Sequence, residues 1–190
     1  MLKKALFLVL LVMVLVPAAA RAADEKPIQL AIFDPIQLVP NDESIKGLGF
    51  NLIYGCNEDF YGVDLGLINR VKGRGVGLEW GAVNVDEGDF SGVQLGFVNI
   101  TKGFMHGIQY GGVNISSGDS RGVEIGLVNY SENYFGGFQG GFFNYAGEMH
   151  GLQFGLVNAT KNLDGLQIGL ANYNGNKKPL EFMVLVNWSF

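Results

Sequence analysis

The sequence contains little of the material that catalytic and metal-binding sites need. Its 190 residues include one cysteine, Cys56, and two histidines, His106 and His150. A single cysteine excludes a disulfide scaffold, and two histidines leave little for a histidine-based metal or nucleophilic site. Basic residues are also few, with 13 Lys and Arg against 18 Asp and Glu. The net charge of -5 argues against a nucleic-acid partner. We therefore expect a protein that is not an enzyme and holds no metal or other cofactor.

Glycine is absent from the start of the chain, and all 29 glycines lie between Gly47 and Gly175. The chain opens with Lys3 and Lys4, continues as the apolar run Ala5–Val16 and reaches the small-residue sequence Ala20-Arg21-Ala22. This order is typical of a secretory signal peptide, and about 12 apolar residues are fewer than the roughly 20 that span a bilayer. We predict a signal peptide over residues 1–22 and a single β-repeat domain over residues 23–190. Export would remove three basic residues and no acidic ones, which leaves a net charge of -8.

The rest of the chain repeats one eight-residue word: Gly, apolar, polar, apolar, Gly, apolar, apolar, Asn. Eight clear copies begin 15 residues apart from Gly62 to Gly137, and then 14 residues apart at Gly151 and Gly165. A degenerate copy, GLGFNLIY, begins at Gly47. The alternation within each word has the period of a β-strand, and the intervening Gly, Asn, Asp and Ser residues are typical of turns. We expect an all-β fold, with an additional first strand at Ile28–Phe33.

Two architectures fit this pattern. In an antiparallel meander of about 10–12 strands, each 15-residue unit is one strand, and the sheet can close into a β-barrel. In a parallel β-solenoid, each unit is one coil, and the asparagines that end the words stack as a ladder. These asparagines are Asn69, Asn84, Asn99, Asn114, Asn129, Asn144, Asn158 and Asn172, with Asn187 near the end of the chain. The column favours the solenoid, but the polar second half of each unit offers little to close a core.

The third position of the word is a second polar column. It consists of Asp64, Glu79, Gln94, Gln109, Glu124, Gln139, Gln153 and Gln167. A carboxylate near the membrane midplane costs several kcal/mol, so in a barrel this column would face the lumen and the apolar residues would face lipid. Tyr130, Tyr145, Tyr173 and Trp188 would then serve as interfacial aromatics.

The C-terminal segment favours the barrel. Phe182, Val184, Val186, Trp188 and Phe190 alternate on one face and end in an aromatic residue. This segment resembles the closing strand of bacterial outer-membrane β-barrel proteins, which implies that it is the recognition signal for the barrel-assembly machinery. The repeat, from Gly47 to Asn187, resembles uncharacterised bacterial surface-repeat proteins with GLQIGLVN-like words, and that resemblance implies no activity.

The remaining titratable residues are interpreted structurally. His106 and His150 each precede a word without an evident partner, and Cys56 is expected as a lone thiol in a turn. Asp64 and Glu79 form the only close carboxylate pair on a polar face, which suits either acid–base chemistry or a polar lumen wall. We expect a non-catalytic envelope protein at the outer membrane or cell surface, with lipid as its partner and a structural or pore-like role. The alternative is a secreted repeat module that binds a protein or glycan.

Overall fold

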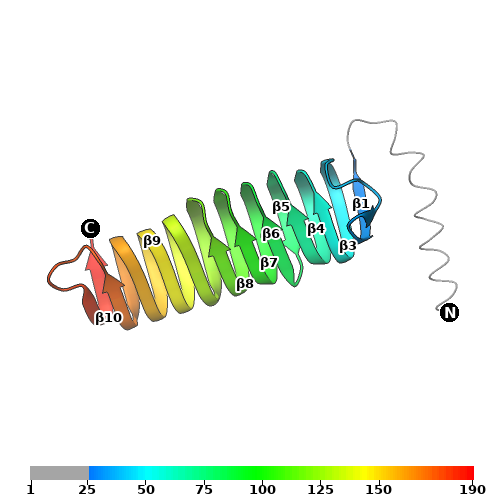
Figure 1. The fold of residues 1–190 in the computed structure, drawn as a ribbon. Coiled ribbons are helices and arrows are strands. Elements are labelled where there is room, and N and C mark those ends of the chain that lie inside the picture. The colour runs from blue at the N-terminus through cyan, green and yellow to red at the C-terminus, as the bar shows by residue number, and fades with distance from the viewer. Residues whose placement is uncertain (1–25) are drawn as a thin grey trace, which may run out of the picture.

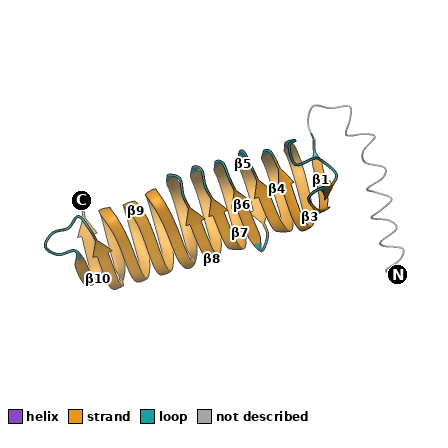
Figure 2. Cartoon of the chain, in the orientation of Figure 1, coloured by secondary structure: helices purple, strands orange, loops and turns teal. Residues whose placement is uncertain are grey.

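In the computed structural model, which describes residues 26–190, the chain winds into a parallel β-solenoid (Figure 1). Its strands are β1 (Ile28–Phe33), β2 (Ile36–Gln37), β3 (Ile45–Asn57), β4 (Phe60–Val71), β5 (Gly75–Trp80), β6 (Val83–Asp86), β7 (Phe90–Thr101), β8 (Met105–Ser116), β9 (Ser120–Asn174) and β10 (Phe182–Ser189). Figure 2 shows only strands and loops in the described part, which confirms the all-β prediction. The described residues contain no helix of the length and hydropathy that would cross a membrane. The predicted signal peptide lies outside the described residues.

The predicted antiparallel barrel is wrong, and the alternative solenoid is right. Successive words pair in parallel and in register, so that Gly92 of β7 lies opposite Gly107 of β8, and Asn99 opposite Asn114. In an antiparallel meander neighbouring words would run in opposite directions, and equal positions would not meet along their whole length. Each unit of 14 or 15 residues is therefore one coil, and the chain returns to the same position one strand spacing further along the axis.

Each coil bends within the word, at its second glycine. Gln94 and Asn99 are both fully buried although they are five residues apart, whereas strict alternation would place them on opposite faces. The chain turns at Gly96, whose Cβ would lie 2.9 Å from the Gly81 carbonyl oxygen and 2.8 Å from the Asn99 side chain. The first glycine forms another constrained point, because Gly107 has a φ of +139° and its Cβ would lie 1.9 Å from the Gly92 oxygen.

The two ends of the solenoid are covered by other strands. At the N-terminal end, β1, which is the predicted first strand, pairs in parallel with β3. The short β2 pairs antiparallel with β1. Here Val39, Ile45, Phe60 and Val71 form a small apolar cluster. At the C-terminal end, β10 reverses direction and lies antiparallel along the last part of β9. The chain termini of the described part thus lie at opposite ends of the molecule (Figure 1).

Candidate functional site

The asparagine column forms a continuous hydrogen-bonded ladder inside the solenoid. Asn99 Nδ2 donates to Asn114 Oδ1 at 2.8 Å, and the same contact recurs from Asn51 to Asn172 at 2.8–2.9 Å. The second N–H of most of these amides donates to a backbone carbonyl, as Asn99 Nδ2 does to the Tyr110 oxygen at 3.2 Å. The ladder asparagines are 0–4% exposed. Asn51, which the repeat analysis did not single out, begins the ladder in the degenerate word.

The column predicted to face a lumen instead fills the interior of the solenoid. All of its eight members are 0–3% exposed, and no lumen is present within the described coils. Gln153 Nε2 donates to Gln139 Oε1 at 2.7 Å and Gln167 Nε2 to Gln153 Oε1 at 2.8 Å. Asn187 of β10 continues this column by donating to Gln167 Oε1 at 2.9 Å, and does not extend the asparagine ladder. Hydrogen-bonded amides, together with buried apolar side chains such as Phe90 and Phe135, thus fill the coil that the sequence suggested lacked a core.

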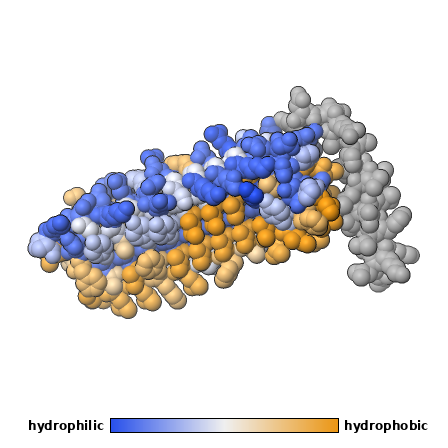
Figure 3. Space-filling view, viewed as in Figure 1, coloured by the Kyte–Doolittle hydropathy of each residue, from blue (hydrophilic) through white to orange (hydrophobic). Residues whose placement is uncertain are grey.

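The outer surface carries the large apolar residues that a soluble protein normally buries. The second, fourth, sixth and seventh positions of the words point outward around the bend, and none of the eight clear words has a charged residue at any of them. We call this surface the apolar face. Its large residues with at least 38% exposure are Leu48, Phe50, Leu52, Ile53, Leu67, Trp80, Phe97, Ile108, Tyr110, Ile125, Leu127, Phe142, Phe143, Phe154, Leu156, Val157 and Leu170. Figure 3 shows apolar residues along one side of the whole described solenoid.

The exposed charged residues lie on the remaining outer side of each coil. Arg70 forms an ion pair with Glu87, and Lys102 approaches the same carboxylate at 3.7 Å. The space-filling view shows hydrophilic residues along the side opposite the apolar one (Figure 3). Tyr130 and Tyr145 directly follow ladder asparagines in successive coils, and their rings stack with centroids 4.9 Å apart. The solenoid is therefore amphipathic along its entire described length.

The C-terminal strand extends the exposed apolar surface. In β10, Phe182, Val184, Val186 and Trp188 are 39–61% exposed, and Phe190 just after it is 95% exposed. The alternation predicted from the sequence is interrupted by a bulge between Met183 and Leu185, where Leu185 adopts a φ of 69°. A role of this strand as an assembly signal stays a prediction.

Two titratable residues differ from their sequence-based interpretation, and a further carboxyl group joins the predicted carboxylate pair. Cys56 lies within β3 and is buried as a free thiol, not in a turn. His150 does have a partner, because its Nδ1 lies 3.1 Å from Asp164 Oδ2. Asp64 and Glu79 lie opposite each other on neighbouring strands, as expected, but buried Asp86 joins them. The sequence did not single out Asp86, because it lies outside the conserved pattern of the word.

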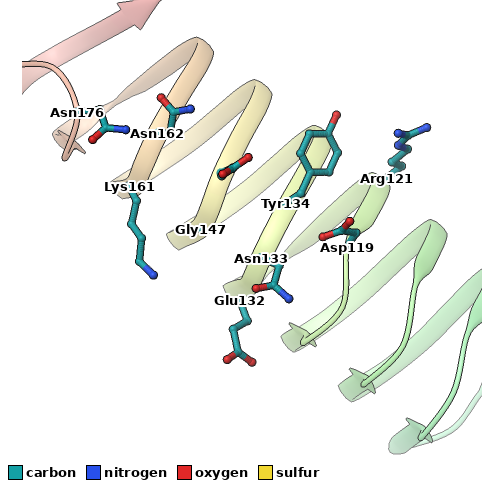
Figure 4. A pocket seen from close by; sticks show the side chains of 10 residues that line it. Asp119, Arg121, Glu132, Asn133, Tyr134, Gly147, Lys161, Asn162 and Asn176 are labelled. Atoms are coloured by element: carbon teal, nitrogen blue, oxygen red, sulfur yellow. The ribbon is translucent and has the colours of Figure 1, made fainter.

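A polar groove of about 580 Å³ lies on the charged side of the C-terminal coils. Figure 4 shows its side chains coming from successive coils. The Arg121 guanidinium lies 5.7 Å from the centre of the Tyr134 ring, and His150 packs against the same ring. The groove is lined by Asp119, Arg121, Glu132, Asn133, Tyr134, Gly147, Glu148, Lys161, Asn162 and Asn176.

Comparison of the chain with protein-family models, with curated proteins and with solved structures finds no match. Among residues 26–190, no group of three or more His, Cys, Asp or Glu is placed to hold a metal ion. The function is therefore argued from the distribution of polar and apolar groups in the fold.

Proposed function

We propose that this protein is an exported, non-catalytic envelope protein that lies on a lipid bilayer with its apolar face in the acyl layer. The observation that carries the proposal is that columns of amide side chains lie inside the solenoid while large apolar side chains cover one outer side. Amides that would be costly near lipid are paired inside, and large apolar side chains point outward. The predicted signal peptide supports export, and the outer membrane is the bilayer that an exported envelope protein meets.

The size of the apolar face supports a lipid partner. Seven of its large residues are Phe, Tyr or Trp, which can each contribute about 150–250 Å². Together with the ten aliphatic residues, and at about half exposure, they give an apolar surface on the order of 1,000 Å² or more. The largest apolar patch on a typical soluble monomer is about 300–600 Å². Trp80 and Tyr110 supply the only side-chain hydrogen-bonding groups among the exposed large residues of this face. Protein interfaces carry about ten hydrogen bonds, so this composition suits acyl chains better than a second protein.

The charge of the molecule selects the kind of bilayer. The mature chain would carry a net charge of -8. Anionic headgroups would repel it, whereas a neutral bilayer would be bound through apolar contact alone. We therefore expect binding to phosphatidylcholine vesicles that changes little between low and high salt and weakens as anionic lipid is added.

Vesicle flotation of the purified protein tests the proposal. Phe97, which is 69% exposed at the middle of the face, is replaced by glutamate, and Asn162 in the polar groove is replaced by glutamate as the control. Loss of one large apolar contact of about 1.5–3 kcal/mol lowers the vesicle partition coefficient at least tenfold for Phe97→Glu. Asn162→Glu should bind like wild type. A folded protein that does not float, or equal binding of the two variants, would overturn the proposal.

Pairing of two apolar faces is a separate outcome of the same experiment. Sedimentation in the absence of lipid would then show a stable dimer, and vesicles would not compete with it. Fluorescence of Trp80 provides a second measurement, made in a Trp188→Phe background. Quenching of Trp80 by lipids brominated in the acyl chain is expected if the face enters the bilayer, and absence of quenching contradicts it.

The polar groove favours a second candidate function, a surface module that binds a glycan. Its lining combines three carboxylates, three amides and two cations, so it offers both hydrogen-bond donors and acceptors. A glycan array probed with the purified protein tests this function, with Asn176→Ala and Lys161→Ala expected to lower the signal. Unchanged signals in both variants would exclude the groove as the site.

A further inference from the structure

Three carboxyl groups are enclosed together in the N-terminal coils. Asp64 on β4 and Glu79 on β5 are register partners, with 3% and 2% exposure. Asp86 on β6 is fully buried. It occupies the interior position where neighbouring coils have Val71 and Thr101, which carry no charge. The sequence thus gathers three acidic groups in neighbouring coils, at interior positions where most other coils have uncharged side chains.

Too few hydrogen-bond donors reach these carboxyl groups. The Gln94 Nε2 amide donates to Glu79 Oε2 at 3.0 Å and also to Asp86 Oδ2. The Asn51 Nδ2 amide donates to Asp64 Oδ1 at 2.8 Å. Asp86 Oδ1 is buried without a hydrogen-bond partner. Three ionised carboxylates have six acceptor oxygens, and these two amides donate to only three of them. A protonated carboxyl group supplies its own O–H donor, which removes this deficit.

The surrounding coil accommodates Asp86 specifically. Gly75 stands at the interior position that Phe60 and Phe90 occupy in the adjacent coils. A Cβ atom on Gly75 would lie 2.5 Å from Asp86 Oδ1. The missing side chain therefore provides the space in which this carboxyl group lies.

No cation of the described residues offsets the three acidic groups. Burial is the main cause that raises the pKa of Asp64 to about 8 and that of Glu79 to about 7, and it also raises the pKa of Asp86. The other groups that act on them are the carboxyls themselves and the side-chain amides of Asn51 from β3 and Gln94 from β7. From β7, Thr101 also bonds Gln94. The buried carboxyl groups are therefore uncharged in the closed coil at mildly acidic pH.

We propose that Asp64, Glu79 and Asp86 form a proton-binding cluster that keeps the coils from β4 to β6 closed in acidic solution and lets them open as the pH rises. Carboxyls exposed by opening ionise near pH 4, whereas those in the closed coil keep their protons up to about pH 7 to 8. Between these values, opening releases protons. The equilibrium constant for opening of these coils then rises about tenfold per pH unit for each proton released. It levels off once the pH exceeds the pKa of the carboxyl groups in the closed coil.

Hydrogen exchange of the full chain between pH 5 and pH 7, corrected for intrinsic rates, tests this proposal. The equilibrium constant for opening of residues 60–86 is expected to be at least 100-fold larger at pH 7 than at pH 5, because the release of one proton over two pH units gives that factor. Peptides from residues 151–172, where the interior columns contain only glutamine and asparagine and make no contact with Glu124, serve as the internal control and should change much less. In the Asp64→Asn, Glu79→Gln, Asp86→Asn triple variant the pH dependence of residues 60–86 should disappear. Persistence of the dependence in that variant, or its absence in wild type, would overturn the proposal.

Carbon-13 NMR titration of the carboxyl groups keeps the proposal testable if the triple variant does not fold. Carboxyl signals of Asp64 and Glu79 that titrate above pH 6 in wild type support it, whereas ionised signals at pH 5 contradict it. The last measurement compares hydrogen exchange at pH 8 with and without added calcium or potassium. If either ion at pH 8 protects residues 60–86 from exchange in wild type, the cluster binds cations, and the proton assignment is wrong.

Discussion

Replacing Glu124 by glutamine is expected to stabilise the solenoid in neutral and alkaline solution. Glu124 is the one carboxyl in the C-terminal part of the third-position column, and its oxygens accept from Gln139 and from the hydroxyls of Ser116 and Ser131. A glutamine there keeps the shape of the side chain and the acceptor oxygen. Its Nε2 group would also donate to Gln109 Oε1, as the neighbouring glutamines of the column donate to one another.

The magnitude follows from the pKa of the buried carboxyl. Burial raises the pKa of Glu124 to about 7 from the ordinary value of 4.5. A raised pKa means that the fold loses stability as the pH rises from about 4.5 to 7, because the unfolded chain gives up its proton first. At 1.36 kcal/mol per pKa unit, this loss is about 3 kcal/mol above pH 7. The glutamine variant avoids this loss, so its free energy of unfolding should exceed that of wild type by about 3 kcal/mol at pH 8 and by almost nothing at pH 4.

Urea unfolding of wild type and variant at pH 4, 6 and 8 measures this difference. Glu148→Gln provides the matched control, because Glu148 is exposed on the outside of the next coil, and its replacement should change the midpoint little at any pH. Equal midpoints of wild type and Glu124→Gln at pH 8 would refute the reasoning. A difference that stays constant from pH 4 to pH 8 would also refute it, since the gain would then come from packing and not from ionisation.

Two further substitutions test the glycine corners and the asparagine ladder. Gly107→Ala should prevent folding or cost more than about 3 kcal/mol, because its Cβ would lie 1.9 Å from a backbone oxygen at a φ of +139°. Gly136→Ala, whose Cβ meets only the Tyr134 side chain, is the control, and thermal melts followed by circular dichroism compare the two. Asn114→Ala should cost about 2–5 kcal/mol in urea unfolding, because Asn99 loses its acceptor and Asn129 its donor inside the solenoid. A loss no larger than that of Asn133→Ala on the exposed surface would contradict the ladder's role.

The repeat predicted the units of the fold but not how they are connected. Alternation in the word is genuine on each side of the bend, so the all-β class and the first strand at Ile28–Phe33 were predicted correctly. The sequence pattern does not reveal the bend at Gly96, because a glycine fits a straight strand as well as a corner. The odd spacing of Gln94 and Asn99 could have indicated the bend. Both positions recur as polar residues along the repeat, and they cannot share one face of a flat strand.

The polar columns were identified from the sequence, but their surroundings were not. The third-position column was assigned to a lumen because a carboxylate facing lipid is costly, and that argument held only for a barrel. Asp86 was missed for a different reason. It precedes the turn Glu87-Gly88, so it resembled one more acidic turn residue until the coil placed it beside Glu79.

The two interior ladders run in opposite directions along the solenoid axis. Each asparagine amide donates to the coil that follows, as Asn84 does to Asn99, whereas each glutamine donates to the coil before it, as Gln109 does to Gln94. Amide dipoles aligned head to tail add to a macrodipole, as peptide units do in a helix. Here the two rows oppose each other, and most of their axial dipole cancels. The ends of the rod therefore gain little opposite charge from their ladders, and solenoids have little electrostatic reason to join head to tail.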